Sequence, residues 1–565
     1  MFKQIALLLC ALPFAFGQNW NQWGQNARHT GTVSVSGQRL EAAIAEFQYD
    51  PLADALRQDA GGDLLVHYMA PIVDGNDVFI MTRVGEWSSC FTVLPPCGTG
   101  LWNYMQWNVT RLSWSNGKLV QKWSTPSHWR PAPDNGSSWE PVFHPVLVGQ
   151  YIYTPSNAGT LLKIDRETGE PVARLNPFDG RDASIYVTGP LTAGNDGSIY
   201  YNAMKWNPSG PWSVNVDGAW LVRIGADGVA AKVSFGTLIP NAPQNCLTTF
   251  NATNAPLPWP PSVNAVPPTA NCGSQRPGLN VAVAIANDGT IYTVSRAHFN
   301  SGYSYLLAVN PDLTPQWSAS LRDRLNDGCG VLLPESGTRG GCRAGATQGV
   351  DPRTNQKPAG QVSDQSTSSP SIAPDGAIFY GATTGYNHGR GHLMKFSAKG
   401  EYLAAFDFGW DNTPAIFAHD GTYSVILKNN HYGLRSYCAF DEFCLRDEER
   451  YELVSLNADL KKEWGFLSTN TMACERQPDG SVQCSTHSAG FEWCVNMVAV
   501  DRDGVMYANS EDGSVYAIDR NGKQLSSFFL KVALGAAYTP LAIGPDGLIY
   551  TQNAGSLFVV GKKAN

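Results

Sequence analysis

Side chains that can move protons, bind metals or hold anions are scattered along the chain. The ones that we single out are His144, Tyr186, Lys205, Arg296, His298, His388 and His431. Imidazole and phenol groups can transfer a proton or bind a metal, and guanidinium and ammonium groups hold anionic or hydroxylated ligands. The spacing of these residues is not diagnostic of one reaction. The elements that position them therefore have to be found first.

One short pattern recurs along the chain and supplies those elements. It consists of an apolar strand, a turn built on Asp-Gly or a similar pair, and a second strand of β-branched and aromatic residues. Clear copies are "GPLTAGNDGSIYYNA" from Gly189, "VAVAIANDGTIYTVS" from Val281, "SSPSIAPDGAIFYGATTG" from Ser368 and "TPLAIGPDGLIYTQN" from Thr539; looser copies begin at Ala70, His144, Thr413 and Asn496. Asp-Gly favours tight hairpins because both central positions tolerate a positive φ. Eight copies of one hairpin indicate a repeat architecture.

The hairpin often continues into a second one, as in "NAGTLLKIDRETGEPVARL" from Asn157. One unit is then a four-stranded antiparallel meander, with strands A to D in chain order. Such a sheet cannot bury both of its faces alone, so eight copies predict an all-β, eight-bladed β-propeller. The last copy, from Thr539, is too short to provide strand D. We expect the segment from Trp20 to Thr30 to complete that blade, because pairing of the N- and C-terminal segments removes two exposed edges.

The first residues, "MFKQIALLLCALPFAFG", are typical of a secretory signal peptide. A lysine precedes an apolar run from Ile5 to Phe16 that is too short to span a membrane, and small residues follow it. We expect residues 1–17 to be removed and residues 18–565 to form a single propeller domain. This domain is expected to be soluble, monomeric, without a membrane span, and secreted or periplasmic.

Composition narrows the range of partners. The formal net charge is −8 and charged residues make up 16% of the chain, so the sequence has no basic footprint for nucleic acid. The 56 glycines, 17 tryptophans and 22 tyrosines are typical of a turn-rich all-β protein. The expected ligand is a small molecule or a polysaccharide.

The cysteines are arranged as close neighbours. In an exported chain such neighbours predict disulfides within loops: Cys90–Cys97, Cys246–Cys272, Cys329–Cys342 and Cys438–Cys444. Cys474, Cys484 and Cys494 cannot all pair among themselves, so one of the three is expected to stay unpaired. No C-x-x-C motif is present, which disfavours a zinc site and a covalently attached haem.

The stretch "QWGQNARHTG" from Gln22, followed by the repeated hairpins, resembles the quinoprotein-like propellers over nearly the whole mature chain. That superfamily includes pyrroloquinoline quinone alcohol dehydrogenases and the non-catalytic outer-membrane assembly propeller. For a dehydrogenase, the resemblance implies a calcium ion and quinone held by Glu140 and Asn280, with Trp493 as the floor and Arg296 beside the quinone. "PSGPWSVNVDGAW" resembles the stretch that carries the family's catalytic aspartate, which makes Asp217 the base. The adjacent cysteine pair of many of these enzymes is absent.

Meander order places the D–A and B–C connections on one face of a propeller, and the residues singled out at the start all fall in those connections. We therefore expect a pocket at the channel mouth on that face, and three functions remain open for it. The first is binding of a polar or polyhydroxylated ligand, and the second is a quinone- and calcium-dependent alcohol or sugar dehydrogenase, an oxidoreductase. The third is a polysaccharide lyase or other acid–base enzyme, in which histidine or tyrosine moves the proton and arginine or lysine neutralises the developing charge.

A transition metal is a variant of the binding function. Copper or zinc could be held by histidines from separate blades, which leave no local motif; the candidates are His67, His144, His298, His388 and His431.

Overall fold

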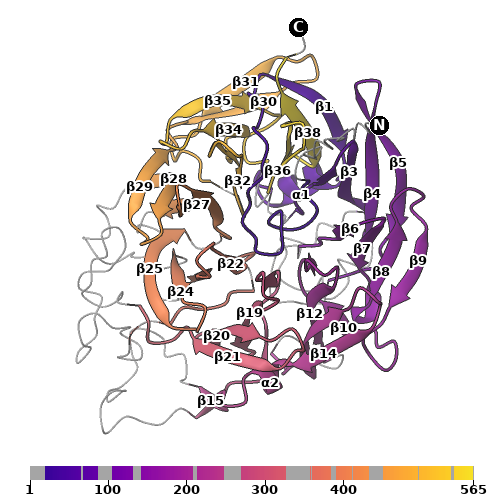
Figure 1. The fold of residues 1–565 in the computed structure, drawn as a ribbon. Coiled ribbons are helices and arrows are strands. Elements are labelled where there is room, and N and C mark those ends of the chain that lie inside the picture. The colour runs from indigo at the N-terminus through magenta and orange to yellow at the C-terminus, as the bar shows by residue number, and fades with distance from the viewer. Residues whose placement is uncertain are drawn as a thin grey trace, which may run out of the picture.

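A computed structural model gives the fold of the protein. It describes residues 19–64, 68–86, 105–131, 142–207, 213–246, 269–325, 357, 359–364, 366–383, 390–409, 412–431, 450–493, 495–535 and 540–563. Within these ranges, eight antiparallel four-stranded blades form a ring (Figure 1). The predicted all-β, eight-bladed propeller is therefore confirmed.

The blades follow one another in chain order. Blade 1 contains β2 (Ile72–Asp74), β3 (Asp77–Gly85), β4 (Met105–Ser115) and β5 (Lys118–Pro126). Blade 2 contains β6 (Val146–Val148), β7 (Tyr151–Pro155), β8 (Leu161–Asp165) and β9 (Pro171–Leu175). Blade 3 contains β10 (Ile185–Val187) and β11 (Thr192–Ala193) as a divided inner strand, then β12 (Ile199–Lys205), β13 (Gly218–Ile224) and β14 (Ala230–Ser234). Blade 4 contains β17 (Gln275–Pro277) and β18 (Ala284–Ile285), again divided, then β19 (Ile291–Ala297), β20 (Ser304–Val309) and β21 (Pro315–Ser320).

The second half of the ring repeats this order. Blade 5 contains β22 (Ser371–Ile372), β23 (Ile378–Thr383), β24 (Arg390–Phe396) and β25 (Tyr402–Gly409). Blade 6 contains β26 (Ala415–His419), β27 (Thr422–His431), β28 (Arg450–Asn457) and β29 (Lys462–Leu467). Blade 7 contains β32 (Ala499–Val500), β33 (Met506–Asn509), β34 (Ser514–Ile518) and β35 (Gln524–Phe529). Blade 8 contains β36 (Ala542–Ile543), β37 (Ile549–Asn553), β38 (Ser556–Gly561) and, as its outer strand, β1 (Ala42–Gln48).

The Asp-Gly turns form for a different reason from the one expected. In the blade 4 turn only Gly289 takes a positive φ, of 85°, whereas Asp288 does not. The Asp288 carboxylate instead accepts a hydrogen bond from the Thr290 backbone N–H at 2.9 Å, which is the local side-chain bond that favours aspartate in turns. The turn therefore needs glycine at one position only.

Neighbouring blades dock through tryptophan and glycine. The Trp123 ring of blade 1 lies on Gly169 in the last turn of blade 2, where an added Cβ would come within 2.6 Å of the indole. Trp317 lies in the same way on Gly400, and Trp464 on Gly522. The indole N–H of Trp123 also donates to the Arg166 carbonyl at 3.0 Å. One side chain thus packs on the next blade and satisfies its own polar atom there.

The ring closes through β1, which pairs antiparallel with β38 from Ala42–Gly561 to Gln48–Ser556. The N- and C-terminal segments therefore pair, as expected. The expectation that Trp20–Thr30 supplies the missing strand is wrong, because that strand lies some twenty residues further along the chain. Residues 20–30 have another role.

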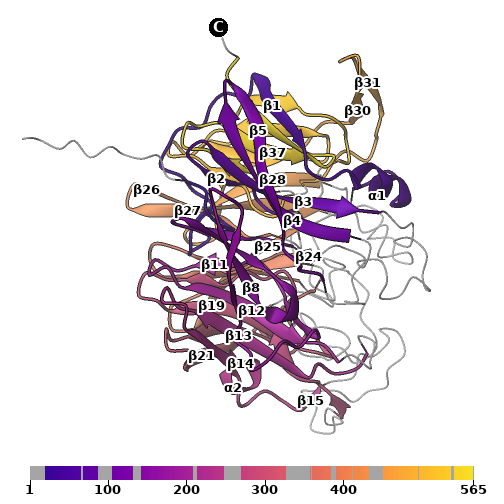
Figure 2. The same ribbon diagram turned by 90° about the vertical axis from the view of Figure 1, so that its right-hand side faces the viewer.

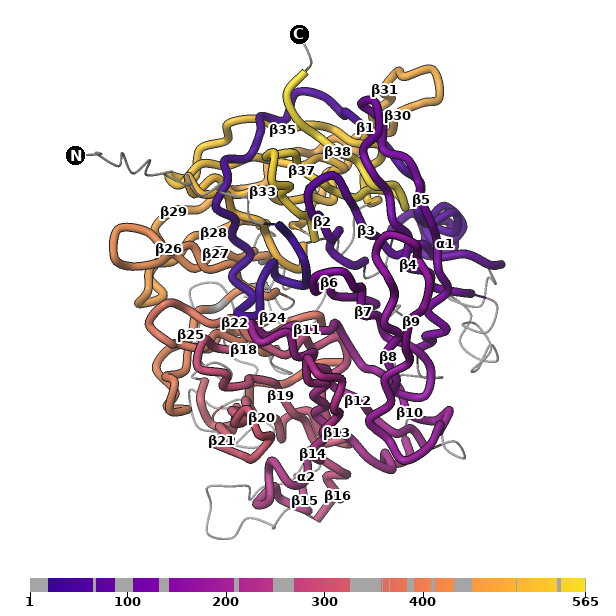
Figure 3. The backbone as a smooth tube through the Cα atoms, turned by 45° about the vertical axis from the view of Figure 1, so that its right-hand side comes forward, coloured from indigo at the N-terminus to yellow at the C-terminus, as the bar shows by residue number. Residues whose placement is uncertain are grey.

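Residues 20–38, which we call the strap, bond to one blade after another (Figure 3). The strap begins at blade 1, where Trp20 and Val73 exchange backbone hydrogen bonds of 2.8 and 2.9 Å. It ends at blade 8, where the Gln38 N–H donates to the Gly547 carbonyl at 2.7 Å. Between these points it bonds to an inner-strand residue of each remaining blade: Leu147, Ala193, Ile285, Ile372, Ile416 and Val500. The strap satisfies edge groups that would otherwise face the centre of the ring unpaired.

The two faces of the ring carry different connections (Figure 2). The tip of the β26–β27 hairpin projects on the left of that view, with the A–B turns. Helix α1 (Ala53–Asp59) and the short hairpins β15 (Asn245–Cys246)–β16 (Ala270–Asn271) and β30 (Met472–Arg476)–β31 (Val482–Thr486) lie on the right, in D–A connections. A short helix, α2 (Phe235–Leu238), and a 3-10 turn, η3 (Asn157–Gly159), complete the described elements. None of the described helices is long and apolar enough to cross a membrane.

Two disulfides lie in those hairpins. Cys246–Cys272 is confirmed, with 5.0 Å between its Cα atoms. Cys474 pairs with Cys484, which accounts for two of the three cysteines left open. Cys494 and the other three predicted pairs lie outside the described residues.

A buried ion pair ties the closing strand to blade 1. Asp50 follows β1, and its two carboxylate oxygens accept hydrogen bonds from the Arg83 guanidinium at 3.1 and 2.6 Å. The Tyr68 hydroxyl donates to the same carboxylate at 2.6 Å, and the Asp50 and Arg83 side chains are both fully buried. A buried pair of this kind is costly to break, because removing one partner strands the other charge away from water.

We predict that Asp50→Asn lowers the free energy of unfolding by about 3–5 kcal/mol, because it removes the Asp50 charge from a fully buried ion pair with Arg83. Guanidinium denaturation of the full chain measures the change. The control is Asp546→Asn in an exposed turn, which should stay within about 0.5 kcal/mol of the wild type. Equal midpoints for the two variants would show that the Asp50–Arg83 pair does not hold the closure.

Candidate ligand-binding site

Among the described residues, a cluster of buried and partly buried charged groups lies at the rim of blade 4, on the D–A and B–C face. Arg276 in β17 lies directly across the strand pair from Arg296 in β19, and like charges so placed repel each other. Asp364, which precedes blade 5, lies between them. Arg276 donates to its two oxygens at 2.8 and 2.6 Å, and Arg296 donates to one of them at 2.8 Å. We call these three residues the Arg–Asp–Arg cluster.

The cluster holds more positive than negative charge in a largely dry setting. The Arg276 side chain is fully buried, whereas those of Arg296 and Asp364 are 13% and 10% exposed. Burial alone would raise the pKa of Asp364, but the two guanidiniums hold it well below its usual range. Burial lowers the pKa of Arg296 to about 10, against the attraction of Asp364. At neutral pH two guanidiniums therefore share one carboxylate.

His298 adjoins the cluster in one defined orientation. The Arg276 Nε–H donates to Nδ1 of His298 at 3.0 Å, and an arginine nitrogen can only donate. Nδ1 therefore carries no proton, and the proton of the neutral ring sits on Nε2. The ring is almost fully buried and stands edge-on to Phe299, with 4.9 Å between centroids.

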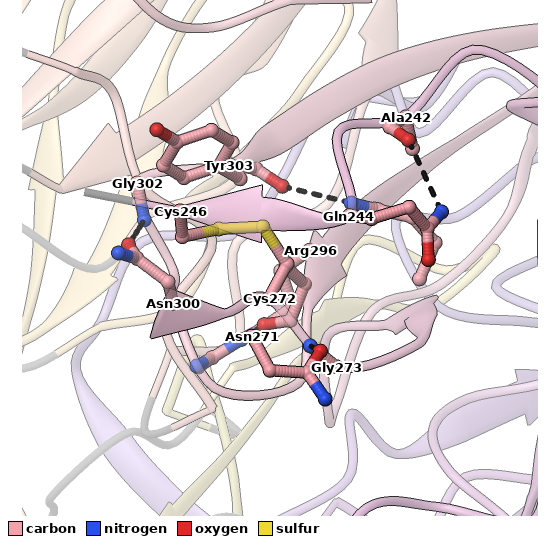
Figure 4. Close-up of a disulfide and its surroundings, with 12 residues drawn as sticks. Ala242, Gln244, Cys246, Asn271, Cys272, Gly273, Arg296, Asn300, Gly302 and Tyr303 are labelled. Carbon is pink, nitrogen blue, oxygen red and sulfur yellow. Dashed lines mark hydrogen bonds between the residues drawn. A yellow bond between two sulfur atoms is a disulfide. The ribbon is translucent and has the colours of Figure 1, made fainter. Parts of the chain in front are cut away.

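The Cys246–Cys272 disulfide anchors this part of the rim (Figure 4). The Cys272 carbonyl accepts the Phe299 N–H at 2.9 Å, and the neighbouring Ser274 carbonyl accepts the His298 N–H at 3.0 Å. These backbone hydrogen bonds join the disulfide-bearing D–A connection before blade 4 to the segment that leaves β19. Arg296 lies near the end of β19 and His298 follows this strand, so both residues lie beside the connection that carries the disulfide.

Two other predicted residues lie in the paired strands β10 and β12 at the rim of blade 3, where Lys205 lies opposite Ile185 and Tyr186 lies opposite Met204. Lys205 ends β12 and forms an ion pair with Asp182 at 2.9 Å, with both side chains more than one-third exposed. Asp182 raises the pKa of Lys205. Burial, together with Asp182, raises the pKa of Tyr186, so the phenol stays protonated at neutral pH. The pair offers an ammonium group and a phenol to a ligand, with Asp182 already bound to the ammonium.

His144 lies against the strap. Its ring is fully buried, contacts Trp23 edge-on at 5.7 Å between centroids, and places Nδ1 2.7 Å from the Pro145 carbonyl. His29 in the strap is buried in the same manner, with Nδ1 2.8 Å from the Pro370 carbonyl. Burial lowers the pKa of both rings to about 4. These two histidines are neutral parts of the interior.

The residues implied for a calcium–quinone site are engaged elsewhere where they are described. The Asn280 side-chain oxygen accepts the Val142 N–H at 2.9 Å. Trp493 is buried against Phe466 and Tyr516 between blades 6 and 7. The Asp217 carboxylate accepts the Asn207 amide at 3.2 Å. The described members therefore give no support to a shared quinone site, since Asn280 and Trp493 are committed to contacts within the protein.

The remaining predicted residues lie beyond the description. Glu140, His388 and His67 are outside the described residues. His431 ends β27, where its backbone pairs with Arg450, and its side chain is not part of the description. In the part of the chain that is described, no three histidine, cysteine, aspartate or glutamate side chains are grouped so that they could hold a metal ion.

Comparison with known proteins supports the fold. A europium-containing methanol dehydrogenase matches with a TM-score of 0.53 and 11% identity, over 94% of this chain and 89% of that chain. The quinohemoprotein alcohol dehydrogenase from Comamonas testosteroni matches with a TM-score of 0.52 and 11% identity, over 97% and 81%. The chain shares the β-propeller fold of these dehydrogenases. No protein-family model and no curated protein matches the chain, and at 11% identity its likeness to the dehydrogenases covers the fold alone.

Arg276 and Asp364 were not expected from the sequence. Both lie where a D–A connection enters an inner strand, which is the position that the meander order assigns to the rim. Arg276 and Asp364 therefore meet the same criterion as Arg296, which is a position at the D–A and B–C face. No pattern in the sequence indicates that these three side chains, 20 and 68 residues apart, pair with one another.

We predict that stability falls as the pH drops from about 6.5 to 4, because the unfolded chain binds protons on His29 and His144 that the folded chain refuses. Each histidine, lowered from 6.5 to about 4, should contribute roughly 3 kcal/mol to this loss. His144→Asn should flatten the dependence of unfolding free energy on pH, and exposed His128→Asn should keep the wild-type slope. An unchanged slope in the His144 variant would contradict the buried, neutral state.

Proposed function

We propose that the protein is a binding propeller that holds an anionic, hydroxylated ligand, such as a uronic acid or a polysaccharide containing one, at the rim of blade 4. Arg296 is the residue expected to meet the ligand. The observation that most supports the proposal is that two arginines bind Asp364. The Arg276 side chain is fully buried, whereas the Arg296 side chain is partly exposed.

Hydrogen bonds within the protein orient the Arg296 guanidinium before a ligand binds. Its Nη1 is bonded to Asp364 at 2.8 Å and its Nε to the Ala297 carbonyl at 3.2 Å, which restricts the guanidinium plane before any ligand arrives. Nη1 also donates to the Val362 carbonyl and Nη2 to the His298 carbonyl, each at 3.4 Å, which leaves one Nη2 hydrogen to donate to a ligand carboxylate. Prior orientation also reduces the entropy lost on binding. The surplus positive charge of the cluster favours an anion.

Lys205 and Tyr186 on blade 3 extend the same rim. The Lys205 ammonium is about one-third exposed, and the protonated Tyr186 phenol can donate a hydrogen bond. Both would suit the hydroxyl or acidic groups of a second sugar unit. The partners are therefore a small molecule or a polysaccharide, and we propose that the chain acts as a monomer.

The acid–base enzyme has less support from these groups. Nδ1 of His298 is occupied by the Arg276 donor, and His144 is fully buried beside the strap. The raised pKa of Tyr186 makes it a poor base. The quinone-dependent dehydrogenase lacks support from Asn280, Asp217 and Trp493 for the reasons given above.

A location outside the cytoplasm is part of the proposal. The disulfides Cys246–Cys272 and Cys474–Cys484 favour an oxidising compartment, such as the periplasm or the exterior, because the cytosol keeps thiols reduced. Both lie in hairpins of D–A connections.

We predict that the mature chain binds D-galacturonate more tightly than D-galactose in isothermal titration calorimetry, and that Arg296→Gln weakens galacturonate binding roughly tenfold or more, as expected for a lost charge-assisted hydrogen bond. Arg223→Gln is the control, because Arg223 pairs with Asp196 near the A–B turn on the other face. Equal affinity in the Arg296 variant and the wild type would refute the placement. Dye-linked alcohol oxidation that depends on added pyrroloquinoline quinone and calcium would support the dehydrogenase instead.

A further inference from the structure

A pocket lies between blades 6 and 7, on the face of the ring opposite the Arg–Asp–Arg cluster. Its volume is about 260 Å³, slightly below the range typical of sites for drug-sized ligands. It is formed by the end of β26, the start of β27 and β29, and the turns of blade 7 that contain Gly504 and Arg520. These are A–B and C–D connections, so the pocket is separate from the rim of blade 4.

The polar side of the pocket is organised around one carboxylate. Oε2 of Glu463 accepts the hydroxyls of Ser424 and Ser455 at 2.6 and 2.7 Å. Both serines are buried, whereas Glu463 is exposed. No described residue forms a hydrogen bond with the second oxygen, Oε1. The two serines thus fix the carboxylate in place and leave an acceptor directed away from them.

His419 borders the same carboxylate. Its Nε2 lies 2.9 Å from the Ser424 hydroxyl and its Nδ1 lies 3.3 Å from the Asp420 carboxylate. Asp420 is also paired with Arg520 at 3.1 Å. Glu463, Asp420 and Arg520 together carry one net negative charge, which disfavours an anionic ligand.

The other side of the pocket is apolar. Phe417 and Trp464 line it with Ile426, and the Phe417 ring stacks on His419 with 5.4 Å between centroids. A Cβ at Gly504 would come within 2.8 Å of the Phe417 ring, so glycine lets the ring stay at the boundary between the blades. An aromatic wall facing a carboxylate and hydroxyls suits a ring that is apolar on one face and carries hydroxyls at its edge.

A catalytic reading of Asp420, His419 and Ser424 is less well supported. Their distances are within hydrogen-bond reach, as in an acyl-transfer triad. However, the Ser424 proton is donated to Glu463 at 2.6 Å, and the Asp420 side chain is 73% exposed and shared with Arg520. A serine whose proton is held by a second carboxylate acts more readily as part of a hydrogen-bonding frame than as a nucleophile for His419.

We propose that this pocket binds a neutral, polyhydroxylated ring of monosaccharide size. Trp464 and Phe417 contact its apolar face, and Glu463 accepts hydrogen bonds from its hydroxyls. The site is independent of the rim of blade 4 and differs from it in charge preference, because the rim favours an anion and this pocket a neutral ligand.

Saturation-transfer NMR with methyl α-D-glucoside on the full mature chain tests the site. Transfer to the glucoside is expected in the wild type, and Glu463→Gln should weaken binding roughly tenfold, because a hydrogen bond to a charged acceptor is lost. Glu401→Gln is the matched control, since Glu401 is a serine-bonded, exposed glutamate in the corresponding turn of blade 5. It should leave the transfer unchanged, as should Arg296→Gln at the rim.

Three results would overturn the proposal. They are no transfer to the glucoside, equal transfer in the Glu463 and Glu401 variants, and hydrolysis of p-nitrophenyl acetate that Ser424→Ala abolishes. Thermal unfolding of the Glu463 variant near the wild-type temperature separates lost binding from lost folding. Because Arg296 lies on the other face, a negative result with the glucoside does not bear on the galacturonate prediction.

Discussion

The inner strand of every blade presents a free edge of backbone N–H and C=O groups to the centre of the ring. The strap bonds to these edges one blade after another, from Val73 in blade 1 to Val500 in blade 7, and reaches blade 8 at Gly547 in its A–B turn. Eight separate sheets are thereby joined by one continuous segment, in addition to the packing of blade on blade. The next residues of the same segment form β1 and close the ring. Inner edges and outer closure thus depend on one stretch of about thirty residues.

This arrangement gives the two faces different characters. The strap bonds close to the A–B turns, so it occupies that end of the ring, where it buries His29 and places Trp23 against the buried His144. The opposite face carries the D–A and B–C connections, where a disulfide and the Arg–Asp–Arg cluster fix the rim of blade 4. The Arg–Asp–Arg cluster has a cost in stability and a use in ligand binding. Arg276 and Arg296 lie opposite each other in β17 and β19, where their positive charges repel. The Asp364 carboxylate offsets this repulsion, and Arg296 stays partly exposed.

The sequence was sufficient to predict the repeat and its consequence. Eight hairpins and the meander order gave the propeller, its chain order and the face that holds Arg296 and His298. The closing strand was misplaced because Ala42–Gln48 is an exposed outer strand with no Asp-Gly turn beside it, whereas Trp20–Thr30 is rich in aromatic and polar residues that turned out to bond across the ring. The partners of Arg296 were missed for another reason: cross-strand register and the entry of the blade 5 connection are three-dimensional properties. Likewise, the burial of His144 follows from the path of the strap.

The central claim is that a preorganised arginine at the rim of blade 4 receives an anionic sugar. A crystal structure of the mature protein grown with D-galacturonate tests it most directly. The account predicts the sugar carboxylate within hydrogen-bonding distance of the Arg296 guanidinium, with Asp364 still bridging Arg276 and Arg296. Galacturonate absent from that rim, or a quinone seated there in its place, would contradict it.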